Sequence, residues 1–138
     1  MAQVYRTDLL QDALADLCDS LDGVRAAVIV SIEGFVVASH PPGEESFAED
    51  DSANSSQVAA MAATLVALAE RTLSRLDQGD IERMLVEGRY GVMIVIPVSN
   101  DAAIAVLLEK GSKLGVALYS GQFAAQRIRN ILEGGLVV

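Results

Sequence analysis

The chain has 138 residues, the size of one ordinary domain, and 51% of them are hydrophobic although only 4% are aromatic and none is Trp. The core must therefore be built from Ala, Val, Ile and Leu, and a charged share of 21%, against about 25% in an average protein, predicts that a second chain covers part of the surface. Ten basic and nineteen acidic residues give a formal net charge of -9, which repels nucleic-acid phosphates and anionic lipids and disfavours both as partners.

Cysteine usage and apolar run length predict a cytoplasmic protein. The one cysteine, Cys18, cannot form an internal disulfide, and residues 1–8 hold no apolar run of the kind found in signal peptides. The longest apolar stretch, Val58–Ala69, is broken only by Thr64 and is shorter than the roughly 20 residues that cross a bilayer. We expect this stretch to form a helix that is buried on more than one side.

Helical spacing of apolar residues predicts a first helix that begins after Thr7 as N-cap and ends at Gly23. Cys18 lies on the apolar stripe of this helix, which indicates a small core residue and not a reactive thiol. Three acidic residues at helical spacing form its solvated face: Asp12, Asp16 and Asp19.

A β-hairpin follows, with strands at Val24–Ile32 and Phe35–Ser39 and a turn at Glu33-Gly34. Strict alternation would place Ala27 and Ile29 on one face of the first strand. The other face would then hold Val24, Ala26, Val28, Val30 and Ile32. Both faces are therefore expected to be covered.

Residues 40–53 read as a solvated acidic loop, in which the only histidine, His40, precedes Pro41. A flexible histidine is a poor base for a Ser/His/Asp or Cys/His site, so we expect no enzyme of that type. The order of the acidic residues does not match a calcium-binding loop, and we predict neither a metal nor a cofactor. These residues are Glu44, Glu45, Glu49, Asp50 and Asp51.

A long second helix is predicted from the possible N-caps at residues 54–56 to about Asp77, with Gly79 as the stop. One broad face carries core-sized side chains: Val58, Met61, Ala62, Leu65, Ala69, Thr72 and Leu76. The opposite face carries small ones that would let another helix approach closely: Ala60, Ala63, Thr64 and Ala67. Arg71 and Arg75 continue this small-residue side, either as ordinary surface charge or as a patch that contacts a partner.

Three strands are expected next, at Ile81–Glu87, Gly91–Val98 and Ala102–Glu109, and the turns between them are short enough to force antiparallel neighbours. The first of these strands is the most polar and suits a sheet edge. A last helix is expected at about Leu118–Glu133, before a flexible tail at 134–138. Gly111-Ser112-Lys113 lacks the glycine spacing and residue order of a phosphate loop and reads as a strand-to-helix connection.

The predicted order is helix, two strands, helix, three strands, helix, an α/β sandwich of the α+β class around an antiparallel sheet. We expect one domain over residues 1–138 with its core at about 7–133. Several phrases in this order resemble the Roadblock/dynein light chain family, including its bacterial MglB type. They are Leu21-Asp22-Gly23-Val24, residues 26–31, Glu33-Gly34-Phe35, residues 94–98, and Glu109-Lys110-Gly111-Ser112-Lys113-Leu114-Gly115.

The resemblance implies a profilin-like, five-stranded antiparallel sheet with the second helix on one face and the terminal helices on the other. It also implies a homodimer in which third strands pair edge to edge and second helices lie side by side. Besides the small-residue side of the second helix, the expected dimer contacts are therefore Ile81, Arg83 and Leu85.

Three functions remain open. The resemblance implies a homodimeric, non-enzymatic regulator of a small Ras-like GTPase, with Arg71 and Arg75 as partner contacts, and leaves open whether GTP hydrolysis is stimulated. The second is a scaffold or light-chain-like adaptor without effect on nucleotide turnover. The third is a small-molecule sensor, against which stands the scarcity of polar groups in the predicted interior.

Overall fold

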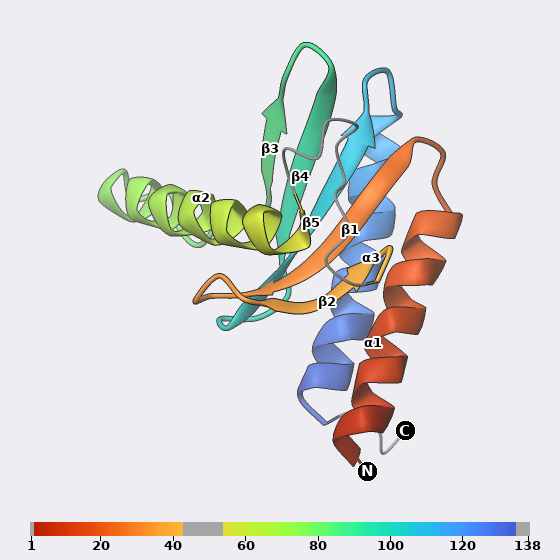
Figure 1. Ribbon diagram of the computed structural model, residues 1–138. Helices are drawn as coiled ribbons and strands as arrows, with labels where there is room; N and C mark the ends of the chain where they lie inside the picture. Colours follow the sequence, from red (N-terminus) through yellow and green to blue (C-terminus); the bar gives the residue numbers. More distant parts are fainter. Residues whose placement is uncertain (1, 43–53, 135–138) are drawn as a thin grey trace.

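The computed structural model describes residues 2–42 and 54–134 and contains the predicted order of elements (Figure 1). The helices are α1 (Ala2–Asp19), α2 (Ser55–Arg75) and α3 (Leu114–Leu132). The strands are β1 (Val24–Ser31), β2 (Val36–His40), β3 (Met84–Glu87), β4 (Gly91–Pro97) and β5 (Ala102–Glu109).

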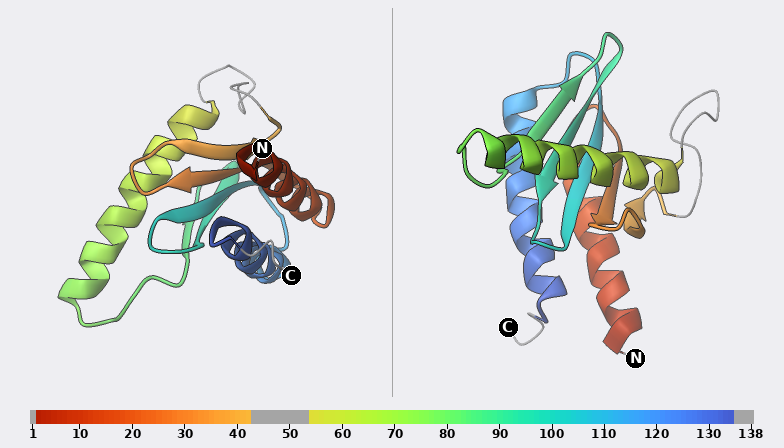
Figure 2. Two further views of the ribbon diagram at one scale, coloured as in Figure 1. Left: turned by 90° about the horizontal axis from the view of Figure 1, so that it is seen from below. Right: turned by 90° about the vertical axis from the view of Figure 1, so that its left-hand side faces the viewer.

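The strands form one antiparallel sheet in the order β2-β1-β5-β4-β3, so that β2 and β3 are its edges. Helices α1 and α3 lie side by side on one face, and α2 crosses the other (Figure 2). This architecture confirms the five-stranded α+β sandwich and the placement of the second helix opposite the terminal ones.

The core has two halves, one on each face of the sheet. Between the sheet and the α1–α3 layer, the largest fully buried side chains are Leu14, Ile29, Ile94, Ile96, Ile104, Leu108 and Ile128. Beneath α2 the cluster is smaller: Val28, Val30, Val58, Ala59, Ala62, Val95, Ala103 and Ala105. Aliphatic residues thus build the core, as the composition predicts.

Strand β1 departs from the predicted alternation at both ends. Val24 packs on the α1–α3 face, not with Val28 and Val30, because the register against β5 shifts between Val24 and Ala26. A β-bulge of this kind inserts one extra residue into the strand, so the side chains before it point to the opposite face of the sheet from the one that strict alternation predicts. Ile32 lies beyond the end of β1 and is 54% exposed, so coverage of both faces ends before it.

The predicted N-terminal boundaries of two helices are wrong. α1 begins at Ala2, so Thr7 lies inside the helix and is not its N-cap. Thr is common at N-caps but also fits inside a helix, and the helix continues before Thr7 because residues such as Ala2 and Gln3 are good helix formers. α3 begins at Leu114, after Lys113 as N-cap and four residues before the predicted start.

Two further boundaries bear on function. His40 is the last residue of β2 and is not part of the predicted 40–53 loop. Residues 43–53 of that loop and residues 135–138 of the predicted tail lie outside the described residues. β3 begins at Met84, so Ile81 and Arg83 precede the strand that was predicted to contain them. Extending the observed register would place Glu82 opposite Pro97, which has no N–H to donate.

Candidate interaction surface

The outer edge of β3 is the first candidate for contact with another chain. Within the described residues, β3 pairs with β4 alone, and its other side carries unpaired backbone groups. Leu85 and Val86 point to opposite faces of the sheet and are both exposed. Because an open strand edge with apolar side chains favours pairing with a further strand, β3 is suited to pair with a strand of another molecule.

Helix α2 extends beyond the sheet that it covers. Asn54 caps it, since its Oδ1 accepts a hydrogen bond from the N–H of Gln57 at 3.0 Å. All of its buried residues come before residue 63, while its second half projects past β3 (Figures 1 and 2). Ala69 and Leu73 nevertheless continue the sheet-facing side of Val58 and Ala62. The overhanging half, residues 67–75, thus has an apolar underside, at Ala69 and Leu73, that this chain covers only in part.

The expectation of a helix buried on more than one side is therefore wrong for the chain by itself. The predicted large-residue face is also rotated from the packing face, because Met61 and Leu76 are exposed and Ala59 is buried. The periodicity of the sequence predicted a broad apolar surface on α2, and the sheet of one chain buries only a narrower strip of it.

The two flanks of α2 differ in what lies beside them. On the small-residue flank, a Cβ placed on Gly34 would stand 3.8 Å from the Cβ of Ala63, so the β1–β2 turn of the same chain already lies there. An apolar crevice of about 70 Å³ separates Ala63 and Ala67 from Pro97. The opposite flank exposes Met61 (51%) and Leu68 (58%), which sequence analysis did not assign to the interface.

Arg71 and Arg75 both lie exposed on the overhanging half of α2, on the side away from the sheet. Neither makes an ion pair within the part of the chain that the structure describes. Their guanidinium groups are therefore free to bind carboxylates of another protein, and a partner contact at these residues stays a prediction.

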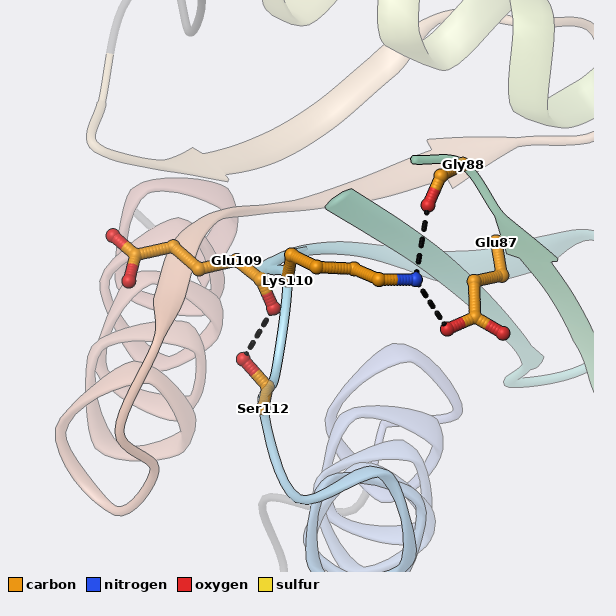
Figure 3. Close-up of polar contacts among 5 residues, drawn as sticks. All are labelled: Glu87, Gly88, Glu109, Lys110 and Ser112. Carbon is orange, nitrogen blue, oxygen red and sulfur yellow. Dashed lines mark hydrogen bonds and ion pairs between the residues drawn. The ribbon is translucent and has the colours of Figure 1, made fainter. Parts of the chain in front are cut away.

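The connection between β5 and α3 is held by polar contacts (Figure 3). Ser112 Oγ donates to the carbonyl oxygen of Glu109 at 2.7 Å, and Lys110 Nζ donates to Glu87 Oε2 at 2.8 Å and to the Gly88 carbonyl at 3.2 Å. These contacts tie the loop to the β3–β4 turn. The prediction that Gly111-Ser112-Lys113 is a strand-to-helix connection is confirmed.

Cys18 lies half-buried on α1 and packs against the core beneath the α1–α3 layer. Burial, with a smaller contribution from the negative charge of Asp19, raises the pKa of its thiol to about 11. Its packing against the core and the upward direction of this pKa shift agree with the interpretation of Cys18 as a structural residue.

A wide acidic cleft of about 980 Å³ lies between the end of α2, the β4–β5 turn and the end of α3. Its charged lining comprises Glu70, Asp77, Asp80, Asp101, Glu133 and Arg129, and Arg129 already pairs with Glu133 at 3.3 Å. Small-molecule sites are usually enclosed and mostly apolar, so this cleft gives the sensor hypothesis little support.

Residues 2–42 and 54–134 hold no group of three or more His, Cys, Asp or Glu side chains that could bind a metal ion. The acidic residues from Glu44 to Asp51 lie outside these ranges. Among the helices described, none has the length and apolar character to cross a membrane.

Comparison with known proteins agrees with this geometry. Residues 10–109 match the model of the Roadblock/LC7 domain, which is more than half of the chain. The chain belongs to the Roadblock/LC7 domain family. Uncharacterized protein MJ1340 of Methanocaldococcus jannaschii is 27% identical to this Roadblock/LC7 chain over 108 residues, which are 78% of this chain and 87% of the relative.

Solved structures show the same fold. A Roadblock/LC7 domain from Streptomyces avermitilis has a TM-score of 0.78 at 22% identity and covers 89% of this chain and 97% of its own. MglB in a tetrameric arrangement has a TM-score of 0.79 at 17% identity, and the match covers 95% of this chain and 93% of the MglB chain. At these identities the likeness establishes the Roadblock fold of the chain.

Proposed function

We propose that this Roadblock/LC7 chain is a homodimeric, non-enzymatic regulator that binds a small Ras-like GTPase. The observation that carries the proposal is the overhanging half of α2, whose underside one chain covers only in part and whose outer side presents two unpaired guanidinium groups. Family membership and the MglB-like fold support the same assignment.

The dimer follows from two exposed features that one contact would cover. Pairing of two β3 edges would extend the sheet across the molecules and bring the partner's sheet under the apolar underside of each overhanging helix. Met61 and Leu68, exposed on the flank of α2 away from the β1–β2 turn, would then meet the partner's α2. On α2 we therefore favour the flank of Met61 and Leu68 as the dimer contact, in place of the predicted small-residue flank of Ala60, Ala63, Thr64 and Ala67. At the strand edge we favour Leu85, which lies in β3, over Ile81 and Arg83, which precede it.

The GTPase would dock on the outer surface of the paired α2 helices. Arg71 and Arg75 stay exposed in such a dimer, and in a chain of net charge -9 they form a local positive patch that attracts an acidic surface. A regulator without catalytic residues acts by repositioning the residues of the GTPase itself, or by holding it in an assembly.

A single-turnover GTP hydrolysis assay with each Ras-like GTPase of the same cell, with and without this protein, tests the function. A changed rate together with direct binding supports the regulator. Binding with an unchanged rate supports the scaffold or adaptor function instead. Failure to bind any of these GTPases in either nucleotide state would overturn the proposal.

A further inference from the structure

The aromatic side chains that the structure describes lie outside the core. All four whose side chains the structure describes are 70–83% exposed: Phe35, Tyr90, Tyr119 and Phe123. Aromatic side chains bury the largest apolar area per residue, and their exposure is typical of binding surfaces. Two of the four lie on one helix, α3.

Tyr119 and Phe123 form an exposed apolar row on α3 together with Val116, which is 50% exposed. The spacing of i, i+3 and i+7 places the three on one side of the helix, away from the buried Gly121 and Ile128. α3 lies on the face of the sheet opposite α2 (Figure 2), so the proposed dimer and GTPase surfaces leave this row uncovered.

An acidic row continues from the apolar one onto the neighbouring helix. α1 and α3 run antiparallel (Figure 1) and are joined by an ion pair of 2.7 Å between Arg127 and Asp16. Along α1, Asp19 lies about one turn after Asp16 and Asp12 about one turn before it. Because the two helices are antiparallel, Asp19 is level with Phe123, which lies one turn before Arg127 on α3. Asp12 and Asp19 are exposed and make no ion pair among the described residues.

The cations near these rows are few. Arg127 is held by Asp16, Arg129 pairs with Glu133, and Lys113 lies at the start of α3 beyond Val116. The outer surface of the α1–α3 layer is therefore apolar at one end and negative at the other.

We propose that this outer surface docks a basic amphipathic helix of a partner protein. Two helices side by side, about 8–10 Å apart, form a shallow seat for a third. Apolar side chains in one half of the partner helix would pack on Val116, Tyr119 and Phe123, and Lys or Arg in its other half would pair with Asp12 and Asp19. A second copy that met this surface with its own α1–α3 layer fits poorly, because it would bring a second acidic row and, near these rows, Lys113 as an unpaired cation at the far end of α3.

The proposal does not depend on GTPase binding and is tested with synthetic peptides. The probe is a helical peptide with three Leu at i, i+3 and i+7 followed by three Lys on the same face, fluorescently labelled. The controls are the same peptide with Glu in place of Lys, and a scrambled peptide of identical composition. We expect the Lys peptide alone to bind, more weakly as salt is added, and to shift the amide resonances of α1 and α3 but not of α2.

Paired variants identify the surface. Tyr119→Gln with Phe123→Gln, and separately Asp12→Asn with Asp19→Asn, should each weaken binding at least tenfold, whereas Phe35→Gln, at an equally exposed aromatic on the β1–β2 side, should not. Circular dichroism verifies that each variant is folded. Equal binding of the scrambled peptide, or wild-type affinity in both double variants, would overturn the proposal. So would a smaller oligomer in light scattering of the Tyr119/Phe123 variant, because the surface would then join copies of this chain.

Discussion

The thiol of Cys18 should make stability depend on pH in the alkaline range. Its pKa is about 11 in the folded chain against an ordinary value of 9.0, so the folded state holds the proton more tightly than the unfolded state. This contribution is complete below pH 9 and is lost as pH rises towards 11. In urea unfolding, wild type should lose more stability than Cys18→Ala between these pH values. If the free energies of unfolding of the two proteins fell in parallel with pH, the raised pKa of Cys18 would be refuted. Comparing the variant with wild type removes the effect of Tyr and Lys titration, because both proteins contain the same Tyr and Lys residues.

Gly121 is a packing glycine of α3. A Cβ at this position would overlap Cδ1 of Ile96, so Gly121→Val should lower the free energy of unfolding by about 1–3 kcal/mol. Gly115 in the same helix has no atom within 4 Å of its Cβ position, and Gly115→Val should stay within about 0.5 kcal/mol of wild type. Denaturant unfolding of both variants measures the difference. Equal effects would mean that Ile96 moves aside at no cost.

At the scale of elements, neighbouring residues on α2 decide which flank forms the dimer. Leu68→Asp would bury an unpaired carboxylate between two helices and should weaken dimerisation by about 100-fold or more. Ala67→Asp lies on the flank beside the crevice at Pro97 and should leave the dimer intact. Light scattering over a dilution series compares them. The reverse result would assign the contact to Ala60, Ala63, Thr64 and Ala67, and a monomeric wild type would exclude the dimer altogether.

At the scale of the whole molecule, dimerisation and GTPase binding should be separable. Arg71→Ala combined with Arg75→Ala removes two exposed cations that no described residue pairs with, so the variant should remain a dimer. It should bind the GTP-loaded partner at least about tenfold more weakly, a loss of about 1.4 kcal/mol. Arg89→Ala, in the exposed β3–β4 turn, is the matched control. Titration in the GTP and GDP states provides the measurement, and unchanged affinity in both would move the contact elsewhere.

Local patterns in the sequence were sufficient to predict much of the fold. The element order, the β1–β2 hairpin, the antiparallel run from β3 to β5 and the start of α2 after Asn54 all depend on periodicity, short turns and a capping side chain, which act between residues close in the chain. The aliphatic core followed from composition. Boundaries failed where a residue type common at N-caps lies inside a helix, as with Thr7, or where another strand limits pairing, since an extension of β3 to Glu82 would bring it opposite Pro97.

The candidate surfaces were visible in the sequence only as apolar or charged positions, and the tertiary structure decided what covers each of them. Periodicity identifies a side chain that avoids water, but the position of the sheet edge determines whether its own chain buries it. The sheet beneath α2 ends at β3, so Val58 is fully buried and Leu73 only in part, although both lie on the same side of the helix. Likewise the sequence determined that Arg71 and Arg75 lie one turn apart, whereas the packing of α2 on the sheet decided that both face away from the sheet and stay exposed.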